Sequence, residues 1–467
     1  MLFNSYPFIF VFLPLVLLGI HLLSRGSRRE VALWFLVVAS LCFYGWWNWH
    51  YLFLFGFSIA FNFTMAEALR PSSRWQVSEK ARRRFLIIAF VGNVLLLGYF
   101  KYRNFFLQTA DSLGAHWQLS SLILPLAISF FTFEQITYVM SAWRGEVGEN
   151  DFLTYCLFIT FFPHLIAGPI VRYGDIAPQL NQRTRLGIDA DDLSTGLMIF
   201  AIGLFKKVIL ADTLRPWVGM VFDSNSLLSF GDAWGGAISF ALEIYFDFSG
   251  YTDMAIGIAR MVGVRFPENF DSPYKAASVI DFWRRWHMTL SYFLRDYVYI
   301  PLGGNRYGEL RQHLNLFLTM LIGGLWHGAN WTFVVWGAVH GVMLSINHAW
   351  RRMGLKLPEW AGWMLTFTAV VSAFVIFRAS SFSRASRILM AMAGANGFRI
   401  AGSDLADPGK LRILLPALAL VLLAPNRQAI VNREWRSDWA YAATFATLIC
   451  ISLLSIANPP PFIYFQF

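Results

Sequence analysis

Residues 85–100 read FLIIAFVGNVLLLGYF and contain no acidic or basic side chain. They follow neither the alternating pattern of a half-buried strand nor the single apolar stripe of an amphipathic helix. A helix needs about 20 mostly apolar residues to cross the hydrocarbon core of a bilayer. We therefore interpret this block as part of a membrane-spanning helix, and similar blocks recur at residues 8–23, 31–47, 52–63, 122–140, 411–423 and 440–456.

The composition of the whole chain also indicates a membrane protein. Of its 467 residues, 57% are hydrophobic and 14% are charged, whereas about 25% of the residues of an average soluble chain are charged. When weaker apolar blocks are counted too, roughly 11 to 14 crossing or re-entrant helices are expected. The predicted fold is an all-α polytopic integral membrane protein, with residues 1–467 forming a single domain.

The net charge of +10 is explained by membrane topology. Arg25, Arg28 and Arg29 follow the first apolar block, and a second basic segment occupies residues 70–84. By the positive-inside rule both segments are cytoplasmic, which places the turn at 48–50 and the N-terminus on the periplasmic side. The basic residues do not cluster on one folded face, so no nucleic acid is expected as a partner.

The middle of the chain, residues 158–341, differs from ordinary membrane helix. It stays apolar but is rich in Gly, Pro, Trp, Tyr and ionisable residues. Charged groups are costly at membrane depth and mark candidate functional sites. We therefore divide the chain into N-terminal helices (1–150), a catalytic core (151–350) and C-terminal helices (351–467), with an exposed loop at 380–410.

Two acidic residues interrupt an apolar segment in YFDFSGYTD, residues 245–253. Asp247 and Asp253 could bind a cation or relay protons, and Gly250 between them permits a kink. A hydrogen-bonded structural brace is slightly favoured, because neither carboxylate has an obvious titrating partner in the sequence.

The segment SVIDFWRRWHMTLSYFLRDYVYIPLGGNR, residues 278–306, predicts an amphipathic helix that ends at Pro301. Its charges are too many for the bilayer centre, so it is expected to lie at an interface. It could position an acidic or phosphate-bearing donor, or it could serve only as an interfacial anchor. At about 100° per residue, one side of this helix is polar; that side carries Asp281, Arg284, His287, Ser291 and Arg295.

A third candidate site is GGLWHGANW, residues 323–331. A lone histidine among apolar residues is usually a satisfied core residue, but the glycines that flank His327 would let a substrate approach closely. Asn330 is expected on the same helical face, where it can hydrogen-bond the ring or the substrate. His340 is expected on another face with a structural role, and His164 stays ambiguous.

These motifs together resemble the membrane-bound O-acyltransferase (MBOAT) family. The resemblance is carried by WHGANW (326–331) and by FWRRWHMTLSYFLRDYVYIPLGGNR (282–306) upstream of it. YFDFSGYTDMAIG (245–257), FPHLIAGPI (162–170) and the terminal FIYFQF (462–467) are similar to the branch of bacterial polysaccharide acetylases. The resemblance covers nearly the whole chain.

The resemblance implies a ring of helices around a thinned centre, with a funnel entered from each side of the membrane. It implies that His327 is the catalytic histidine and that His287 is the second signature histidine. It further implies an inner-membrane enzyme that O-acetylates an exported polysaccharide such as alginate or cellulose. The expected partners are a periplasmic acetyltransferase and a polysaccharide synthesis and export complex. Because the chain closes soon after its last helices, cellulose stays level with alginate as the expected polymer.

The expected acetyl donor is cytoplasmic acetyl-CoA, with no tightly bound cofactor. No catalytic metal is expected, since the histidines lack i,i+4 pairing and no cysteine is nearby. A histidine has an ordinary pKa of about 6.5, which suits it to remove a proton at neutral pH, so His327 is the expected general base on the acceptor hydroxyl. A covalent acetyl-histidine stays open as a variant of this mechanism. The donor-binding or supporting candidates are Asn330, Trp326, Arg284, Arg285, Asp281, Ser291, Asp247 and Asp253.

Two alternative functions stay open. An aminoacyl or acyl transferase for a cell-envelope polymer would share the scaffold but would take its group from a carrier protein. A proton-coupled transporter also uses intramembrane His and Asp residues. A transporter would favour paired inverted repeats with broken helices, whereas the polar section occurs once in this sequence.

Overall fold

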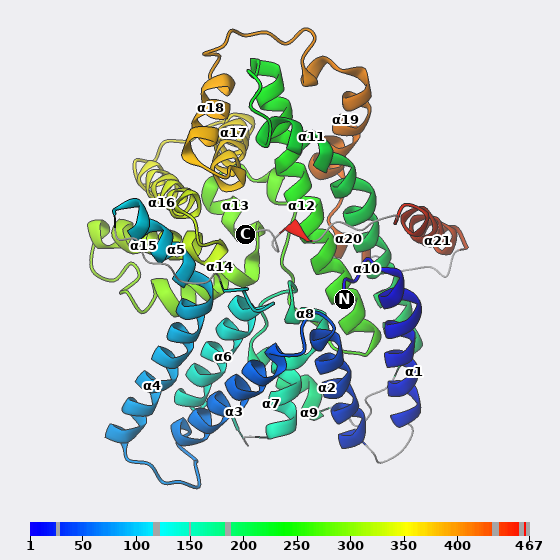
Figure 1. Ribbon diagram of the computed structural model, residues 1–467, viewed down its shortest axis with the longest axis vertical. Helices are drawn as coiled ribbons and strands as arrows, with labels where there is room; N and C mark the ends of the chain where they lie inside the picture. Colours follow the sequence, from blue (N-terminus) through cyan, green and yellow to red (C-terminus); the bar gives the residue numbers. More distant parts are fainter. Residues whose placement is uncertain are drawn as a thin grey trace. The chain divides into compact units, whose positions relative to one another are not determined.

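The structure is a computed structural model that describes residues 1–24, 29–114, 122–148, 151–182, 188–431, 439–456 and 462–463. Arg25, Arg28 and residues 464–467 of the FIYFQF motif lie outside the described residues. The described residues form helices joined by turns, with no strand among them (Figure 1). The all-α class predicted from the apolar blocks is confirmed.

The chain divides into two compact units. The first contains Met1–Ala201 and Thr252–Pro267, and the second contains Ile202–Tyr251 and Glu268–Phe467. Two long helices, α10 (Ala190–Phe205) and α12 (Phe230–Met261), contribute residues to both units. Both candidate histidines, His287 and His327, belong to the second unit.

The first unit is built from the N-terminal apolar blocks. The helix of the block at 122–140 begins only at Ile128, because Pro125 and the left-handed Ala127 (φ 63°) precede it. Some of the other helices begin at a polar N-cap residue; for example, the side chain of Ser78 accepts a hydrogen bond from Ala81 N at the start of α4. The remaining elements are η1 (Phe8–Phe12), α1 (Leu13–Leu23), α2 (Arg29–Gly45), α3 (Tyr51–Leu69), α4 (Glu79–Leu97), η2 (Gly98–Tyr102), α5 (Arg103–Ser112), α6 (Ile128–Trp143), α7 (Phe152–Thr160), α8 (Phe162–Leu165) and α9 (Tyr173–Gln182).

The second unit contains the segments that carry the candidate site. Its helices α15 and α16 pack side by side (Figure 1). Its elements besides α12 are η3 (Lys206–Ala211), α11 (Asp212–Phe222), η4 (Pro273–Lys275), α13 (Val279–Arg285), α14 (Met288–Leu294), η5 (Arg295–Tyr299), α15 (Glu309–His327), α16 (Trp331–Arg352), α17 (Glu359–Arg378), α18 (Phe382–Met392), η6 (Asp404–Ala406), α19 (Pro408–Leu423), α20 (Arg427–Val431) and α21 (Trp439–Leu454).

Several helices are suited to contact lipid. Large apolar side chains on α3 and α4 point outward, among them Phe53 (74% exposed) and Leu95 (65% exposed). Such side chains would be unfavourable in water over so large an area. Among the described residues, four helical stretches are long and apolar enough to cross a membrane, namely Tyr51–Leu69, Glu79–Ser112, Ala190–Phe222 and Glu359–Arg378.

The exposed loop predicted at 380–410 is wrong in its first half, which forms α18. Ser381 caps this helix by accepting from Arg384 N. The buried side of α18 repeats at helical spacing through Ala385, Ile388 and Met392. The many small and polar residues of this stretch concealed that period in the sequence.

Candidate active site

The polar segment that starts at residue 278 is not one continuous helix. α13 ends before Trp286, which is extended (φ −101°, ψ 127°), and α14 begins after His287, which is left-handed (φ 43°, ψ 54°). The single polar face predicted for this segment is therefore wrong. A left-handed non-glycine residue is strained and persists only when its surroundings fix it, so the neighbours of His287 must hold its backbone in this conformation.

Asn269 fixes the conformation of this break. Its side-chain Oδ1 accepts hydrogen bonds from Thr289 Oγ1 (2.9 Å) and Thr289 N (3.3 Å), and it lies 3.1 Å from His287 Nδ1. Its backbone oxygen accepts from Met288 N (2.9 Å). A backbone N–H can only donate, so the atom that faces Thr289 is the amide oxygen, and His287 must donate from Nδ1.

The orientation of His287 has a chemical consequence. With the proton on Nδ1, the neutral imidazole keeps its lone pair on Nε2. This Nε2 is buried and has no hydrogen-bond partner among the described residues. His287 is therefore held as a potential base or hydrogen-bond acceptor. Sequence reasoning missed Asn269, because it lies in an irregular loop and belongs to no recognised motif.

His327 ends α15, and the chain bends directly after it. Gly328 is extended, and Asn330 caps α16 by accepting from Thr332 N at 3.0 Å. The prediction that Asn330 shares a helical face with His327 is therefore wrong, because the helix stops between them. The side-chain oxygen of Asn330 is used to start the next helix.

The two histidines lie together in a buried aromatic cluster. The ring centroids of His287 and His327 are 6.4 Å apart. His287 is 0% exposed and His327 is 5% exposed. The ring of Trp326 lies 4.9 Å from that of His327 and 5.9 Å from that of His287. The rings of Trp336 and Phe377 also lie near that of His327, with centroids at 5.1 and 5.3 Å. Polar interactions formed in such a site are weakly screened.

The glycines near His327 do not leave open space beside it. A Cβ on Gly324 would lie 2.3 Å from Phe333 O, and one on Gly328 would lie 2.2 Å from the ring of Phe333. The absence of side chains at these positions lets α15 approach α16 closely. The interpretation that these glycines thin a wall for substrate is therefore wrong; they serve helix packing.

His340 lies in the same cluster, joined to the site through Trp336. Its ring is 4.7 Å from that of Trp336, and its Nδ1 accepts from Trp283 Nε1 at 3.2 Å. His340 does not face away from His327, because the helix breaks at Gly328 and the angle expected for one continuous helix does not apply. Its contact with Trp283 ties α16 to α13.

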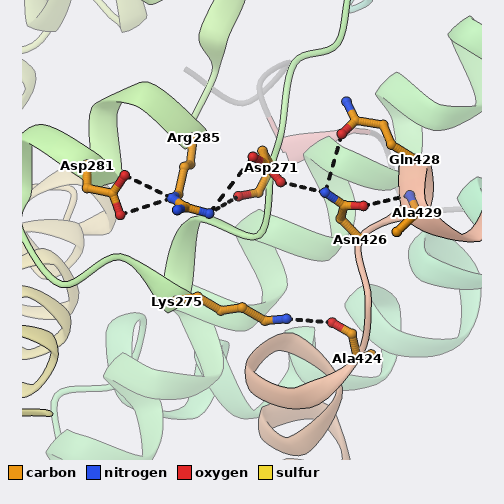
Figure 2. A network of polar contacts seen from close by, with 8 residues as sticks. All are labelled: Asp271, Lys275, Asp281, Arg285, Ala424, Asn426, Gln428 and Ala429. Carbon is orange, nitrogen blue, oxygen red and sulfur yellow. Dashed lines mark hydrogen bonds and ion pairs between the residues drawn. The ribbon is translucent and has the colours of Figure 1, made fainter. Parts of the chain in front are cut away.

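The two neighbouring arginines have different surroundings. Arg285 Nε lies 3.0 Å from both carboxylate oxygens of Asp281, and the guanidinium also contacts Asp271 (Figure 2). Arg284 is exposed at the end of α13. Ser291 Oγ donates to Trp286 O at 3.4 Å, so it contacts the break itself. Of the two arginines, Arg284 is the better placed to meet an external anion.

Asp247 has the cationic partner that the sequence did not reveal. Lys207 Nζ lies 2.6 Å from Asp247 Oδ1 and 2.6 Å from Asp212 Oδ1. Asp247 Oδ2 also accepts from Ile463 N at 2.9 Å. All three side chains come from the second unit, whereas Asp253 is buried in the first unit. These contacts support the brace interpretation for Asp247.

We expect Asn269→Ala to lower kcat by up to about 100-fold, since a misplacement of about 1 Å of a reacting group can cost that much. The donor KM should change little, because Asn269 contacts His287 and not the surface. Steady-state kinetics of the purified protein measure both constants. Asn269→Asp, which keeps an accepting oxygen, should retain more activity than Asn269→Ala. Equal losses would contradict the role of the Asn269 oxygen in orienting His287.

Comparison with known proteins adds independent information. A sequence profile of the membrane-bound O-acyltransferase family matches residues 144–390. The chain is 43% identical over 429 residues to the peptidoglycan O-acetyltransferase of Helicobacter pylori, covering 85% of this chain and 80% of that protein. It is 40% identical over 434 residues to the probable alginate O-acetylase AlgI of Pseudomonas aeruginosa, covering 91% and 81%. It is 28% identical over 345 residues to the teichoic acid D-alanyltransferase of Bacillus subtilis, covering 68% and 84%.

Proposed function

Because this chain belongs to the membrane-bound O-acyltransferase family, we propose that it moves acetyl groups from a cytoplasmic donor to hydroxyl groups of an exported polysaccharide. The observation that carries the proposal is the buried pair His287 and His327, with ring centroids 6.4 Å apart. Relatives named as O-acetylases at about 40% identity support acetyl as the transferred group.

His327 acts as the general base in the proposed mechanism. It takes the proton of the acceptor hydroxyl while the hydroxyl oxygen attacks the carbonyl carbon of the thioester. The tetrahedral intermediate then collapses, the carbon–sulfur bond breaks, and the thiolate receives the proton from His327. His287, with its Nε2 lone pair, supports His327 or accepts a hydrogen bond from the acceptor, and Asn269 holds it in place. Trp326 packs against both rings and fixes their separation.

Acetyl-CoA is the proposed donor, and its phosphates are proposed to bind at Arg284. A guanidinium offers a planar fork of donors that matches a phosphate group. We expect Arg284→Ala to raise the KM for acetyl-CoA about 10-fold, which corresponds to about 1.4 kcal/mol, with kcat little changed. Initial rates at varied acetyl-CoA concentration measure this. Arg285→Ala is the matched control, because Arg285 is already paired with Asp281. An unchanged KM in Arg284→Ala would remove this residue from the donor site.

The proposed architecture treats residues 1–467 as a single membrane domain with its catalytic core at 151–350. The family resemblance implies a ring of helices around a central funnel, and the length of the apolar blocks favours roughly 11 to 14 crossing and re-entrant helices. The chain would lie in the inner membrane with a periplasmic N-terminus, as the basic segments favour. A periplasmic acetyltransferase and a polysaccharide synthesis and export complex would be its partners.

The polymer is proposed to be a glycan of the cell surface or envelope. The names of the relatives support alginate or peptidoglycan. The sequence predicts alginate or cellulose, and the first of these relatives adds peptidoglycan. All of these polymers offer sugar hydroxyls, so the chemistry proposed for His327 is the same for each of them.

The decisive experiment supplies acetyl-CoA labelled in its acetyl group to one side of sealed proteoliposomes that contain the chain. Label recovered as ester on a polysaccharide or oligosaccharide acceptor on the other side supports the proposal. Uptake of intact acetyl-CoA without ester formation would instead support a transporter. The similarity to a D-alanyltransferase makes a carrier-protein donor the second candidate, and D-alanyl carrier protein should give no transfer if the proposal is correct.

A further inference from the structure

A short segment near the C-terminal end of the second unit contacts the loop that carries Asn269. We call residues 424–428, which connect the end of α19 to the first residues of α20, the strap. Asn426 Nδ2 donates to Asp271 Oδ1 at 2.5 Å, and Arg427 forms an ion pair with Glu268 (Figure 2 shows the Asn426 contact). The backbone oxygen of Ala424 accepts from Lys275 Nζ at 2.6 Å. The strap thus reaches this part of the chain through three separate contacts.

The loop itself is joined to the break between α13 and α14. Asp271 N donates to Arg285 O at 2.9 Å, and Met288 N donates to Asn269 O at 2.9 Å. These bonds hold the loop alongside the backbone on both sides of His287. Any displacement of the loop would therefore move Asn269 Oδ1 relative to the imidazole.

The contacts of the strap flank Asn269 closely. Glu268 directly precedes Asn269, and Asp271 follows two residues later. The contacts of Arg427 and Asn426 therefore hold the loop immediately before and after the residue that orients His287. Asn426 is itself fixed, because its Oδ1 accepts from Ala429 N at 2.7 Å at the start of α20.

We infer that the strap positions His287, with Asn426 and Arg427 acting through Asp271, Glu268 and Asn269. The left-handed backbone of His287 (φ 43°) is strained and must be held by its surroundings. The strap supplies part of that restraint, although its first residue, Ala424, follows His287 by 424 − 287 = 137 positions in the chain. As a statement about catalysis the inference rests on the proposed function.

Exchange of the contacting groups tests the Asn426 contact. Asn426→Asp places a second carboxylate opposite Asp271, and the two negative charges repel each other. We expect kcat for acetyl transfer to fall about 10-fold with an unchanged donor KM. Asp271→Asn should have a small effect, because an amide pair can still form a hydrogen bond. The double variant Asn426→Asp with Asp271→Asn restores the carboxylate–amide pair and should return kcat close to wild type.

The matched control is Asn396→Asp, which makes the same amide-to-carboxylate exchange at an exposed residue outside the strap and the loop, where the amide donates to Leu228 O; it should leave kcat unchanged. A wild-type kcat in Asn426→Asp would overturn the inference. A double variant as impaired as Asn426→Asp would overturn it as well. A loss confined to the amount of folded protein, with unchanged kcat per folded molecule, would assign the strap a purely structural role and would also overturn it.

Chemical labelling of His287 provides a readout that does not need activity. Diethyl pyrocarbonate modifies unprotonated imidazole nitrogens, and mass spectrometry of the full-length protein's peptides gives the extent at His287. Modification should rise several-fold in Asn426→Asp, and stay at the wild-type level in the double variant and in Asn396→Asp. If the wild-type chain transferred no acetyl group, the proposed function would fail while this labelling still decided the role of the strap. Equal labelling in all four proteins would refute that role.

Discussion

Replacing His327 with alanine is expected to lower kcat for acetyl transfer by about 100- to 10 000-fold, the range that general base catalysis typically contributes. An alcohol attacks a thioester poorly unless its proton is removed as the new bond forms. His327 is buried next to His287 and Trp326. Bulk water therefore has little access to act as the base in its place. Label transfer from acetyl-CoA to an acceptor, normalised to folded protein in the membrane, measures the effect.

His340→Gln is the control for this prediction. His340 is buried in the same aromatic cluster and has a hydrogen bond to Trp283, so its replacement perturbs packing without removing the proposed base. We expect a much smaller loss of kcat than in His327→Ala. Retained transfer in His327→Ala at normal protein levels would end the proposed mechanism. A comparable loss in both variants would show that the effect comes from packing.

The general-base and covalent versions of the mechanism differ in what accumulates. In the covalent version an acetyl-histidine forms when the donor is present and the acceptor is absent. Rapid acid quenching followed by mass spectrometry of the peptides with His287 and His327 would detect it. Because the Asn269 contact leaves the lone pair of His287 on Nε2, His287 is a candidate for acetylation alongside His327.

The class of the fold could be predicted because its cause is local. Long apolar blocks form helices wherever water is replaced by lipid or protein, and the blocks at 31–47 and 52–63 correspond to α2 and α3. Both histidines could be identified as well, since polar groups in an apolar segment are unusual. These signals depend on a few neighbouring residues and not on the tertiary structure.

The breaks after Arg285 and His327 could not be located from local sequence alone. The first has no proline or glycine at the turn and depends on Asn269, which lies 18 residues before His287 in the chain. The break after His327 follows an apolar stretch whose glycines suggest room for a substrate. In the structure Gly324 instead faces the backbone of α16. Helical-face arguments fail in both places, because they assume a helix that continues through the residue of interest.

The partner of Asp247 could not be predicted from local sequence either. Lys207 precedes Asp247 by 247 − 207 = 40 residues, and the two side chains meet only in the folded second unit. Lys207→Met would leave the buried carboxylate of Asp247 and the partly buried carboxylate of Asp212 without their shared cation. Removing one partner of a buried ion pair typically costs about 3 to 5 kcal/mol. We expect a destabilisation of that order, measured by equilibrium unfolding of the detergent-solubilised protein.

The triple variant Lys207→Met, Asp212→Asn and Asp247→Asn separates a brace from a relay or cation site. It removes all three charges while keeping similar side-chain volumes, and replacing a buried ion pair by neutral groups is often close to neutral for stability. The amide oxygen at position 247 can still accept from Ile463 N. If Asp247 is a brace, the triple variant should regain both stability and acetyl transfer. If Asp247 carries protons or binds a cation, the triple variant should fold but transfer no acetyl group, because an amide can do neither in place of a carboxylate.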